Sequence, residues 1–263
     1  MLPQALIFDV DGTLAETERD GHRMAFNAAF REAGLGWTWD EALYGELLAV
    51  AGGKERIRAF LSRHHPGFDP PGGESLETFV ARLHRMKNAH FARLLEQGAV
   101  NLRPGVARLI GEARAAGVPL AIATTTSPEN VERLLARTLG PEAPGWFACI
   151  VAGDMVPAKK PAPDAYLRVL AELDADPGRC MAFEDSAQGL KAARTAGLPV
   201  VVTPSHYTRG EDFTGAALVV SDLGEPARPF RVLAGDAGGA GWVDLGLIRR
   251  LLEGQARARE AVR

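Results

Sequence analysis

The segment Leu6–Leu14 is an apolar run that ends in two aspartates, Asp9 and Asp11, just before Gly12 and Thr13. Side chains alternate along a strand, so residues two apart share a side, and Gly12 ends the strand expected at residues 5–10. Two carboxylates brought together repel each other unless a cation lies between them or one keeps its proton. A solvated acidic turn would explain the motif alone, but the motifs downstream favour an active site.

After residue 100, strand-like apolar runs alternate with helical segments. Helix starts are expected at Pro104-Gly105 and Ser127-Pro128, with Gly117 and Gly140 just past the helix ends. Strands are expected at residues 118–124, 147–152, 180–183, 198–202 and 217–220. This order is typical of an α/β protein, and we predict a Rossmann-like parallel sheet core with helices on both faces.

Between the first strand and the next strand–helix unit lies a long insertion with helical spacing. Helices are expected at residues 22–33, 41–50 and 76–97. The side chains expected to face a bundle core are Met24, Ala28, Phe30, Phe79, Leu83, Met86, His90 and Leu94. We therefore predict an α-helical cap domain at residues 15–97, inserted into a core domain of residues 1–14 and 98–263.

Three more polar motifs accompany the later strands. Thr124 ends the second strand, Glu184 and Asp185 end the strand at 180–183, and Lys160 precedes Pro161 and a helix start. In open α/β sheets, ligands bind outside the carboxyl ends of the strands. We expect these side chains to gather there with the two aspartates.

In this order the four motifs resemble those of the haloacid-dehalogenase-like phosphohydrolases. The resemblance implies that Asp9 is a nucleophile that forms an aspartyl-phosphate and that Asp11 is the general acid and base. Thr124 and Lys160 would hold the phosphoryl oxygens. Mg²⁺ would be bound by the carboxylate of Asp9, the main-chain carbonyl of Asp11, and Asp185. Glu184 would bind it directly or through water.

Some assignments have rivals within the sequence. Thr125 or Thr126 could supply the hydroxyl in place of Thr124, and Lys159 competes with Lys160, although only the second lysine precedes proline. Glu184 could also be only a helix-start acid that favours the helix dipole.

The cap segment Ala51–Ile57 carries two glycines before a basic helix start. Such glycines can present main-chain N–H groups to an anion, whereas Lys54 and Arg56 in a first turn oppose the helix dipole. The alternative is an ordinary solvated turn that binds no ligand. The segment resembles the cap loop of the Calvin-cycle-associated phosphatases that act on xylulose 1,5-bisphosphate, the CbbY-like subfamily.

That resemblance implies a phosphosugar substrate bound partly by the cap. Lys54, Arg56 and Lys87 would bind the phosphate that is not cleaved, and Glu18, His22, Tyr44 and His84 would contact the sugar, with Glu16 a rival of Glu18. The remaining expected substrate contacts are Gly52, Gly53, Glu55, Thr125 and Thr126. A phosphosugar mutase of the β-phosphoglucomutase type is the alternative, since the catalytic motifs do not separate water from a hydroxyl as acceptor. The intact acidic and lysine motifs argue against a non-catalytic phosphosugar binder.

Composition sets outer limits. A formal net charge of −3 argues against a general binder of nucleic acid or other polyanions, and no apolar run approaches the length of a membrane span. The amino terminus lacks the pattern of a signal peptide, and Cys149 and Cys180 lie in apolar runs that predict buried free thiols. We expect a cytoplasmic monomer. The arginine-rich helix expected near residues 244–260 has no assigned function, and the alternatives for it are packing on the core and association.

Overall fold

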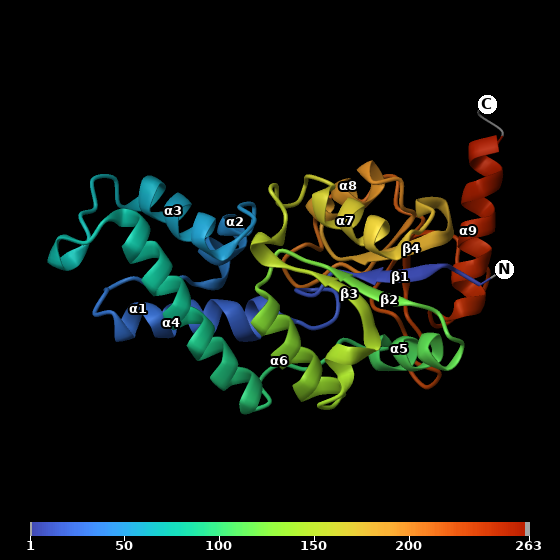
Figure 1. Cartoon of the computed structure of the whole chain (residues 1–263), viewed down its shortest axis with the longest axis horizontal. Helices are drawn as coiled ribbons and strands as arrows, with labels where there is room; N and C mark the ends of the chain where they lie inside the picture. Colours follow the sequence, from blue (N-terminus) through green and yellow to red (C-terminus); the bar gives the residue numbers. More distant parts are fainter. Residues whose placement is uncertain (1, 261–263) are drawn as a thin grey trace. The chain divides into compact units, whose positions relative to one another are not determined.

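The structure, a computed structural model, describes residues 2–260 (Figure 1). The chain divides into two compact units: Thr17–Val100 forms one, and the segments before and after it form the other. The domain boundaries expected after residues 14 and 97 stay predictions. Across the described residues, no helix is both long enough and apolar enough to cross a membrane.

The core unit is built on one sheet, which confirms the predicted α/β fold. Within residues 2–260 its strand order is β3-β2-β1-β4-β5-β6-β7. The pairs from β3 to β6 are all parallel. Strands β1, β2, β4, β5 and β6 are buried along their whole length, as expected for strands covered on both faces, whereas Ala148 in β3 is exposed. The bounds are β1 Ala5–Phe8, β2 Leu120–Ala123, β3 Phe147–Val151, β4 Cys180–Glu184, β5 Val200–Val202, β6 Leu218–Val220 and β7 Val232–Gly235.

Helices cover both faces of this sheet. Figure 1 shows α5 (Val106–Ala115) and α6 (Pro128–Leu139) on one face, and α7 (Asp164–Leu173) and α8 (Ala187–Thr195) on the other. Ser127 and Gly140 flank α6 as the sequence predicts. Short 3₁₀ turns at Ala143–Trp146 (η3), Gly153–Met155 (η4) and Pro177–Arg179 (η5) complete the connections.

Two features of the sheet differ from the sequence prediction. The first strand ends at Phe8, so Asp9 and Asp11 lie in the loop beyond it, where Leu14 N donates to Val10 O at 2.9 Å. Their placement is therefore set by this loop rather than by strand alternation. The last strand was expected at 217–220, but β7 follows it and pairs antiparallel with β6. All four residues of β7 are exposed, so it lacks the alternating pattern of a half-buried strand.

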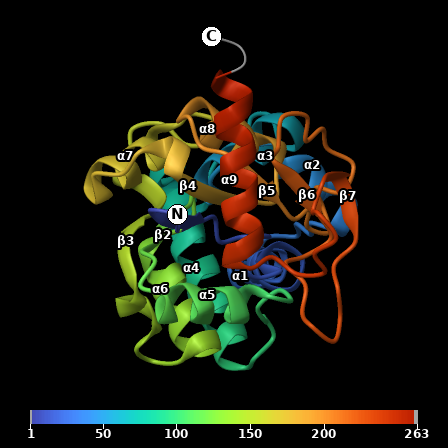
Figure 2. The same cartoon turned by 90° about the vertical axis from the view of Figure 1, so that its right-hand side faces the viewer.

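The carboxyl-terminal helix α9 (Leu245–Glu260) packs on the core unit (Figure 2). Its buried residues include Leu247 and Ile248, and its first main-chain N–H, from Leu245, donates to Glu112 of α5 at 3.0 Å. It also contacts η5, immediately before β4 begins. The helix therefore completes the core at the amino-terminal side of β4, away from the strand ends that carry the polar motifs.

The unit formed by Thr17–Val100 is helical, which confirms the predicted helical cap. Its elements are η1 Glu18–His22, α1 Arg23–Glu32, α2 Glu41–Leu47, α3 Gly53–His64, η2 Pro71–Gly73 and α4 Leu76–Glu96. The aromatic side chains of Phe26, Phe30, Trp39 and Phe60 pack with ring centroids 4.6 to 6.5 Å apart, so aromatic packing supplies much of this small core.

The expected apolar faces of two cap helices are partly wrong. Met24 is 48% exposed and Ala28 is half-buried, whereas Phe30 is buried as predicted. Ala25, Phe26 and Ala29 complete the inner face of α1. In α4 the residues expected at the later turns, Met86, His90 and Leu94, are only half-buried. The buried positions there are Phe79, Val80, Leu83, Lys87, Phe91, Ala92 and Leu95. A buried lysine breaks the apolar pattern, which is why the inner face of α4 was misplaced.

Candidate active site

The site begins at the carboxyl ends of β1 and β4, which lie side by side. Phe8 pairs with Phe183, their rings stack with centroids 4.5 Å apart, and Asp9 N donates to Phe183 O at 3.0 Å. This register brings Asp9 next to Glu184. The chain leaves β1 toward β2 and later returns on the other side at β4, so the two acids lie where the strand order reverses, the usual ligand site of such sheets.

Lys160 connects these two acids. Its Nζ donates to Asp9 Oδ1 and to Glu184 Oε1, both at 2.6 Å, and all three side chains are buried. Burial alone lowers the pKa of Lys160, but Asp9 and Glu184 raise it above its ordinary value, so the ammonium keeps its charge. Lys159 instead pairs with Asp154 at 3.1 Å. The structure therefore brings Lys160, and not Lys159, to the acids.

Glu184 is held on several sides. Tyr166 in α7 donates its hydroxyl to Glu184 Oε1 at 2.6 Å, and Asp185 N donates to Glu184 Oε2 at 3.3 Å. A Cβ on Gly189 would lie 1.9 Å from Glu184 Oε2, so only glycine fits there. Sequence reasoning missed Tyr166. The position of this tyrosine, at the start of the helix that follows the lysine motif, could have indicated that it lies near the site.

Asp9, Glu184 and Asp185 form a buried carboxylate cluster in which one oxygen of each lies within 4.8 Å of the others. Burial raises the pKa of Asp9 to about 7, Lys160 opposes this rise, and Glu184 and Asp11 add to it. Burial, Asp9 and Glu184 also raise the pKa of Asp185 well above its usual range. Three carboxylates against one ammonium leave excess negative charge, which a divalent cation would neutralise.

The other predicted core residues lie around this cluster. Thr124 is buried directly after β2, and its Oγ1 accepts from Thr126 N at 3.4 Å, whereas Thr125 and Thr126 are half-buried. Asp11 is half-buried and contributes to the raised pKa of Asp9, although its carboxylate is outside the three-residue cluster. Cys149 and Cys180 are buried free thiols in the sheet, as predicted.

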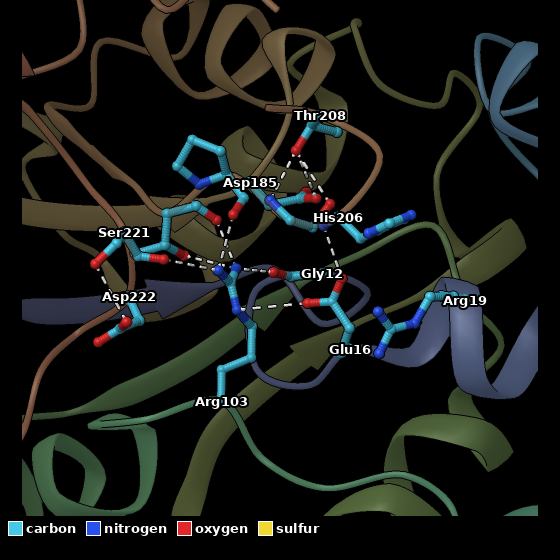
Figure 3. A network of polar contacts seen from close by, with 12 residues as sticks. Gly12, Glu16, Arg19, Arg103, Asp185, His206, Thr208, Ser221 and Asp222 are labelled. Atoms are coloured by element: carbon cyan, nitrogen blue, oxygen red, sulfur yellow. Dashed lines mark hydrogen bonds and ion pairs between the residues drawn. The ribbon is translucent and has the colours of Figure 1, made fainter. Parts of the chain in front are cut away.

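A second polar group in the core unit was not anticipated (Figure 3). The side chain of Arg103 donates to several main-chain carbonyls and pairs with Glu16 Oε2 at 3.7 Å. Glu16 Oε1 in turn accepts from His206 N at 2.8 Å. Glu16 is thus engaged within the core unit, whereas its rival Glu18 makes its contacts within the cap. The sequence feature that could have pointed to this polar group is the arginine directly before Pro104-Gly105.

Three predicted cap residues contact one another. Tyr44 donates its hydroxyl to Glu18 Oε2 at 2.5 Å, and Arg56 Nη1 donates to the Tyr44 hydroxyl at 3.0 Å and lies 3.8 Å from Glu18 Oε2. Arg56 also donates to the carbonyls of Leu47 and Val50 at 3.3 and 3.4 Å. Its guanidinium is therefore built into the cap, and it fixes the Glu18–Tyr44 pair.

The other predicted cap residues lie near the start of α3 and on α4. Gly52 has φ +95° at the helix start, and a Cβ on Gly53 would lie 2.6 Å from His84 Nε2. Lys87 Nζ is buried 5.3 Å from the Phe26 ring centroid and 5.2 Å from that of Phe91. The ring of buried His22 lies 4.0 Å from that of Phe91. Lys54 and Glu55 are half-buried in the first turn of α3.

The family model for haloacid dehalogenase-like hydrolases matches residues 3–197. The chain belongs to this family. It is 48% identical over 246 residues to the CbbY protein encoded on a plasmid of Cupriavidus necator, across 94% of this chain and 95% of that protein. The family and its phosphatase relatives make this chain a phosphatase, as the motifs predicted.

Two crystal structures of CbbY from Rhodobacter sphaeroides are similar to this haloacid dehalogenase-like hydrolase. The complex with phosphate is 49% identical, with a TM-score of 0.78 over 84% of this chain and 95% of that chain. A mutant in complex with xylulose-(1,5)bisphosphate is 48% identical, with a TM-score of 0.78 over 86% of this chain and 98% of that chain.

Proposed function

We propose that this phosphatase hydrolyses a sugar bisphosphate with the help of Mg²⁺, and that its substrate is xylulose 1,5-bisphosphate. The products would be xylulose 5-phosphate and inorganic phosphate. The observation that carries the proposal is the buried cluster of Asp9, Lys160, Glu184 and Asp185 at the strand ends. The choice of sugar is supported by the similarity to CbbY, which has been crystallised with that bisphosphate.

In the proposed reaction a carboxylate oxygen of Asp9 attacks phosphorus, and the bond from phosphorus to the sugar oxygen breaks. Asp11 donates a proton to the departing sugar oxygen. Water then attacks phosphorus of the aspartyl-phosphate and gives a proton to Asp11. The bond between phosphorus and the Asp9 oxygen breaks, so phosphate is released and both side chains are restored. Asp11 suits this role because its carboxylate is half-buried and close enough to Asp9 to help raise the pKa of that side chain.

The donor set at the strand ends fits Mg²⁺, since it consists of carboxylate oxygens with excess negative charge. Asp9 and Asp185 would hold the ion together with the main-chain carbonyl of Asp11. Both oxygens of Glu184 already accept hydrogen bonds, which favours contact through water. The bound ion would screen the repulsion between Asp9 and the phosphate.

Lys160 and Thr124 would hold the non-bridging phosphoryl oxygens. Lys160 is fixed by Glu184, which Tyr166 fixes in turn, so the ammonium is oriented before substrate arrives. Such preorganised charge is the main means by which proteins catalyse phosphoryl transfer.

The cap would bind the rest of the substrate. Lys54 and the main-chain N–H groups at Gly52 and Gly53 would bind the phosphate that is not cleaved, with Arg56 and Lys87 adding positive charge. Glu18, His22, Tyr44 and His84 would contact the sugar, and Glu55, Thr125 and Thr126 complete the proposed contacts. Binding energy from the remote phosphate would help to align the attack at phosphorus.

A substrate panel at fixed Mg²⁺ tests this proposal. Release of inorganic phosphate should be fastest from xylulose 1,5-bisphosphate, slower from ribulose 1,5-bisphosphate, and slower still from sugar monophosphates. Addition of EDTA should abolish the reaction, and Mg²⁺ should restore it. Conversion of β-glucose 1-phosphate to glucose 6-phosphate, faster than hydrolysis of any bisphosphate, would identify a mutase instead.

A further inference from the structure

Arg103 is a largely buried cation, its side chain 9% exposed, whose partners are mostly main-chain carbonyls (Figure 3). Its guanidinium donates to Gly12 O, to Thr203 O at 2.5 Å, to Pro204 O at 2.9 Å and to Ser221 O at 3.1 Å. Only arginine offers several donors in one rigid plane, whereas lysine is a point charge with a single nitrogen. The site is therefore built for this side chain.

The carbonyls belong to segments that follow the carboxyl ends of three strands. Gly12 lies in the turn that carries Asp11 beyond β1, Thr203 and Pro204 follow β5, and Ser221 follows β6. A single side chain thus holds together three loops at the edge of the sheet where the carboxylate cluster lies.

Two of these loops enclose Asp185. A Cβ on Gly12 would lie 2.2 Å from Asp185 Oδ2 and 3.1 Å from Ser205 Cβ, so the carboxylate packs directly against the Gly12 backbone. On the other side, Thr208 Oγ1 donates to Asp185 Oδ2 at 3.4 Å and accepts from Ser205 N at 2.8 Å. Arg103 therefore holds the backbone on both sides of Asp185.

The same arginine lies where the chain returns from the cap. Ala15 pairs with Leu102 in an antiparallel bridge, and the next residue of each segment, Glu16 and Arg103, forms an ion pair at 3.7 Å. Thr17, which follows Glu16, begins the cap unit. The two chain crossings are thus tied together by the residue that also holds the loops around Asp185.

We propose that Arg103 is a positioning residue that sets the Asp185 carboxylate for divalent-ion binding through the Gly12 turn and the 203–208 loop. The inference rests on the proposed Mg²⁺-dependent function. A purely structural arginine would contribute to folding stability and leave the affinity for the ion unchanged.

The test measures binding of Mn²⁺ alone to the full-length protein by electron paramagnetic resonance, with circular dichroism as a check of folding. Arg103→Lys keeps the charge but loses the planar set of donors. It should weaken Mn²⁺ binding about 10-fold to 100-fold, as substitutions of residues that orient metal ligands do. With p-nitrophenyl phosphate, the Mg²⁺ concentration for half-maximal rate should rise similarly. KM for the ester at saturating Mg²⁺ should stay within about twofold, because the ester-binding groups are untouched.

Arg108→Lys is the matched control. Arg108 also donates to main-chain carbonyls, those of Leu223, Gly224 and Val243 at 2.9 to 3.2 Å, but none belongs to the loops around Asp185. This variant should bind Mn²⁺ like the wild type. Equal Mn²⁺ affinity in wild type and Arg103→Lys, or equal weakening in both lysine variants, would overturn the proposal.

Glu16→Gln keeps the test decisive if Arg103→Lys does not fold. The amide oxygen can still accept from His206 N, but the charge that faces Arg103 is lost, so Mn²⁺ binding should weaken about threefold. Unchanged affinity in this variant would also contradict the proposal. Absence of sugar-bisphosphate hydrolysis by the wild type would refute the proposed substrate and leave the comparison of Mn²⁺ affinities valid.

Discussion

The core unit and the cap each bury a charged cluster, and the two clusters differ in sign and construction. In the core, Asp9, Glu184 and Asp185 lie together, and the ammonium of Lys160 donates to the first two. In the cap, buried Arg56 and Lys87 lie against aromatic rings, and Arg56 also lies 3.8 Å from Glu18 Oε2. Buried charge is tolerated only when it is paired or awaits a ligand. We therefore propose the core cluster as the site of the metal ion and of covalent chemistry, and the cap cluster as part of an anion site.

The largest expected effect tests the core cluster. Asp9→Asn should lower the rate of phosphate release more than about a thousandfold, because an amide is a poor nucleophile and a weaker metal ligand. The variant should keep the circular dichroism spectrum of the wild type, since the side chain is nearly isosteric. Appreciable hydrolysis by the purified variant would remove Asp9 from the role of nucleophile.

Asp11→Asn tests whether the two aspartates divide the chemistry. Loss of the general acid and base should lower kcat about 10²-fold to 10⁴-fold. Breakdown of the aspartyl-phosphate should slow, so enzyme quenched in acid after exposure to labelled substrate should retain label, unlike Asp9→Asn. Wild-type turnover in Asp11→Asn would contradict this division.

The proposed anion site of the cap is tested by Lys54→Ala, which leaves the internal contacts of Arg56 in place. If Lys54 binds the remote phosphate, kcat/KM for a bisphosphate should fall by about 1.5–3 kcal/mol, while hydrolysis of p-nitrophenyl phosphate should barely change. Arg58→Ala, an exposed cation on the same helix, is the matched control and should change neither. Equal losses on both substrates in Lys54→Ala would point to a fault in folding instead.

The smallest expected effect concerns the support of Lys160. Tyr166→Phe removes the hydroxyl that donates to Glu184, and kcat should fall about tenfold with KM little changed, since a hydrogen bond to a charged group is lost. Lys159→Ala should leave kcat unchanged, because that lysine pairs with Asp154. A larger loss in Lys159→Ala than in Tyr166→Phe would reverse the assignment of the two lysines.

Local sequence patterns were sufficient to predict the alternating fold, the helical cap and the core motifs. Apolar runs of strand length, glycine and proline at element ends, and polar residues just after strands are short-range signals, and each motif could be located without knowledge of the others. Lys160 was preferred to Lys159 on the proline that follows it and on the family pattern, and in the structure Lys160 contacts Asp9 and Glu184 while Lys159 pairs with Asp154.

Signals that depend on packing were misread or missed. Lys87 interrupts the apolar face of α4 because aromatic rings accept its buried charge, and β7 is an exposed edge strand without alternation. The contact of Lys87 with Phe26 and the pairing of β7 with β6 both join residues that are distant in the sequence.

The sequence by itself therefore determined which side chains could perform the chemistry, because residue type and position after a strand are local properties. Only the tertiary structure decided how they are held: Tyr166 on Glu184, Arg56 on the Glu18–Tyr44 pair, and Arg103 across three loops. These contacts join residues up to 118 positions apart, and no local pattern encodes such a pairing. Burial strengthens these contacts, since hydrogen bonds and charge–charge interactions are stronger where water is excluded.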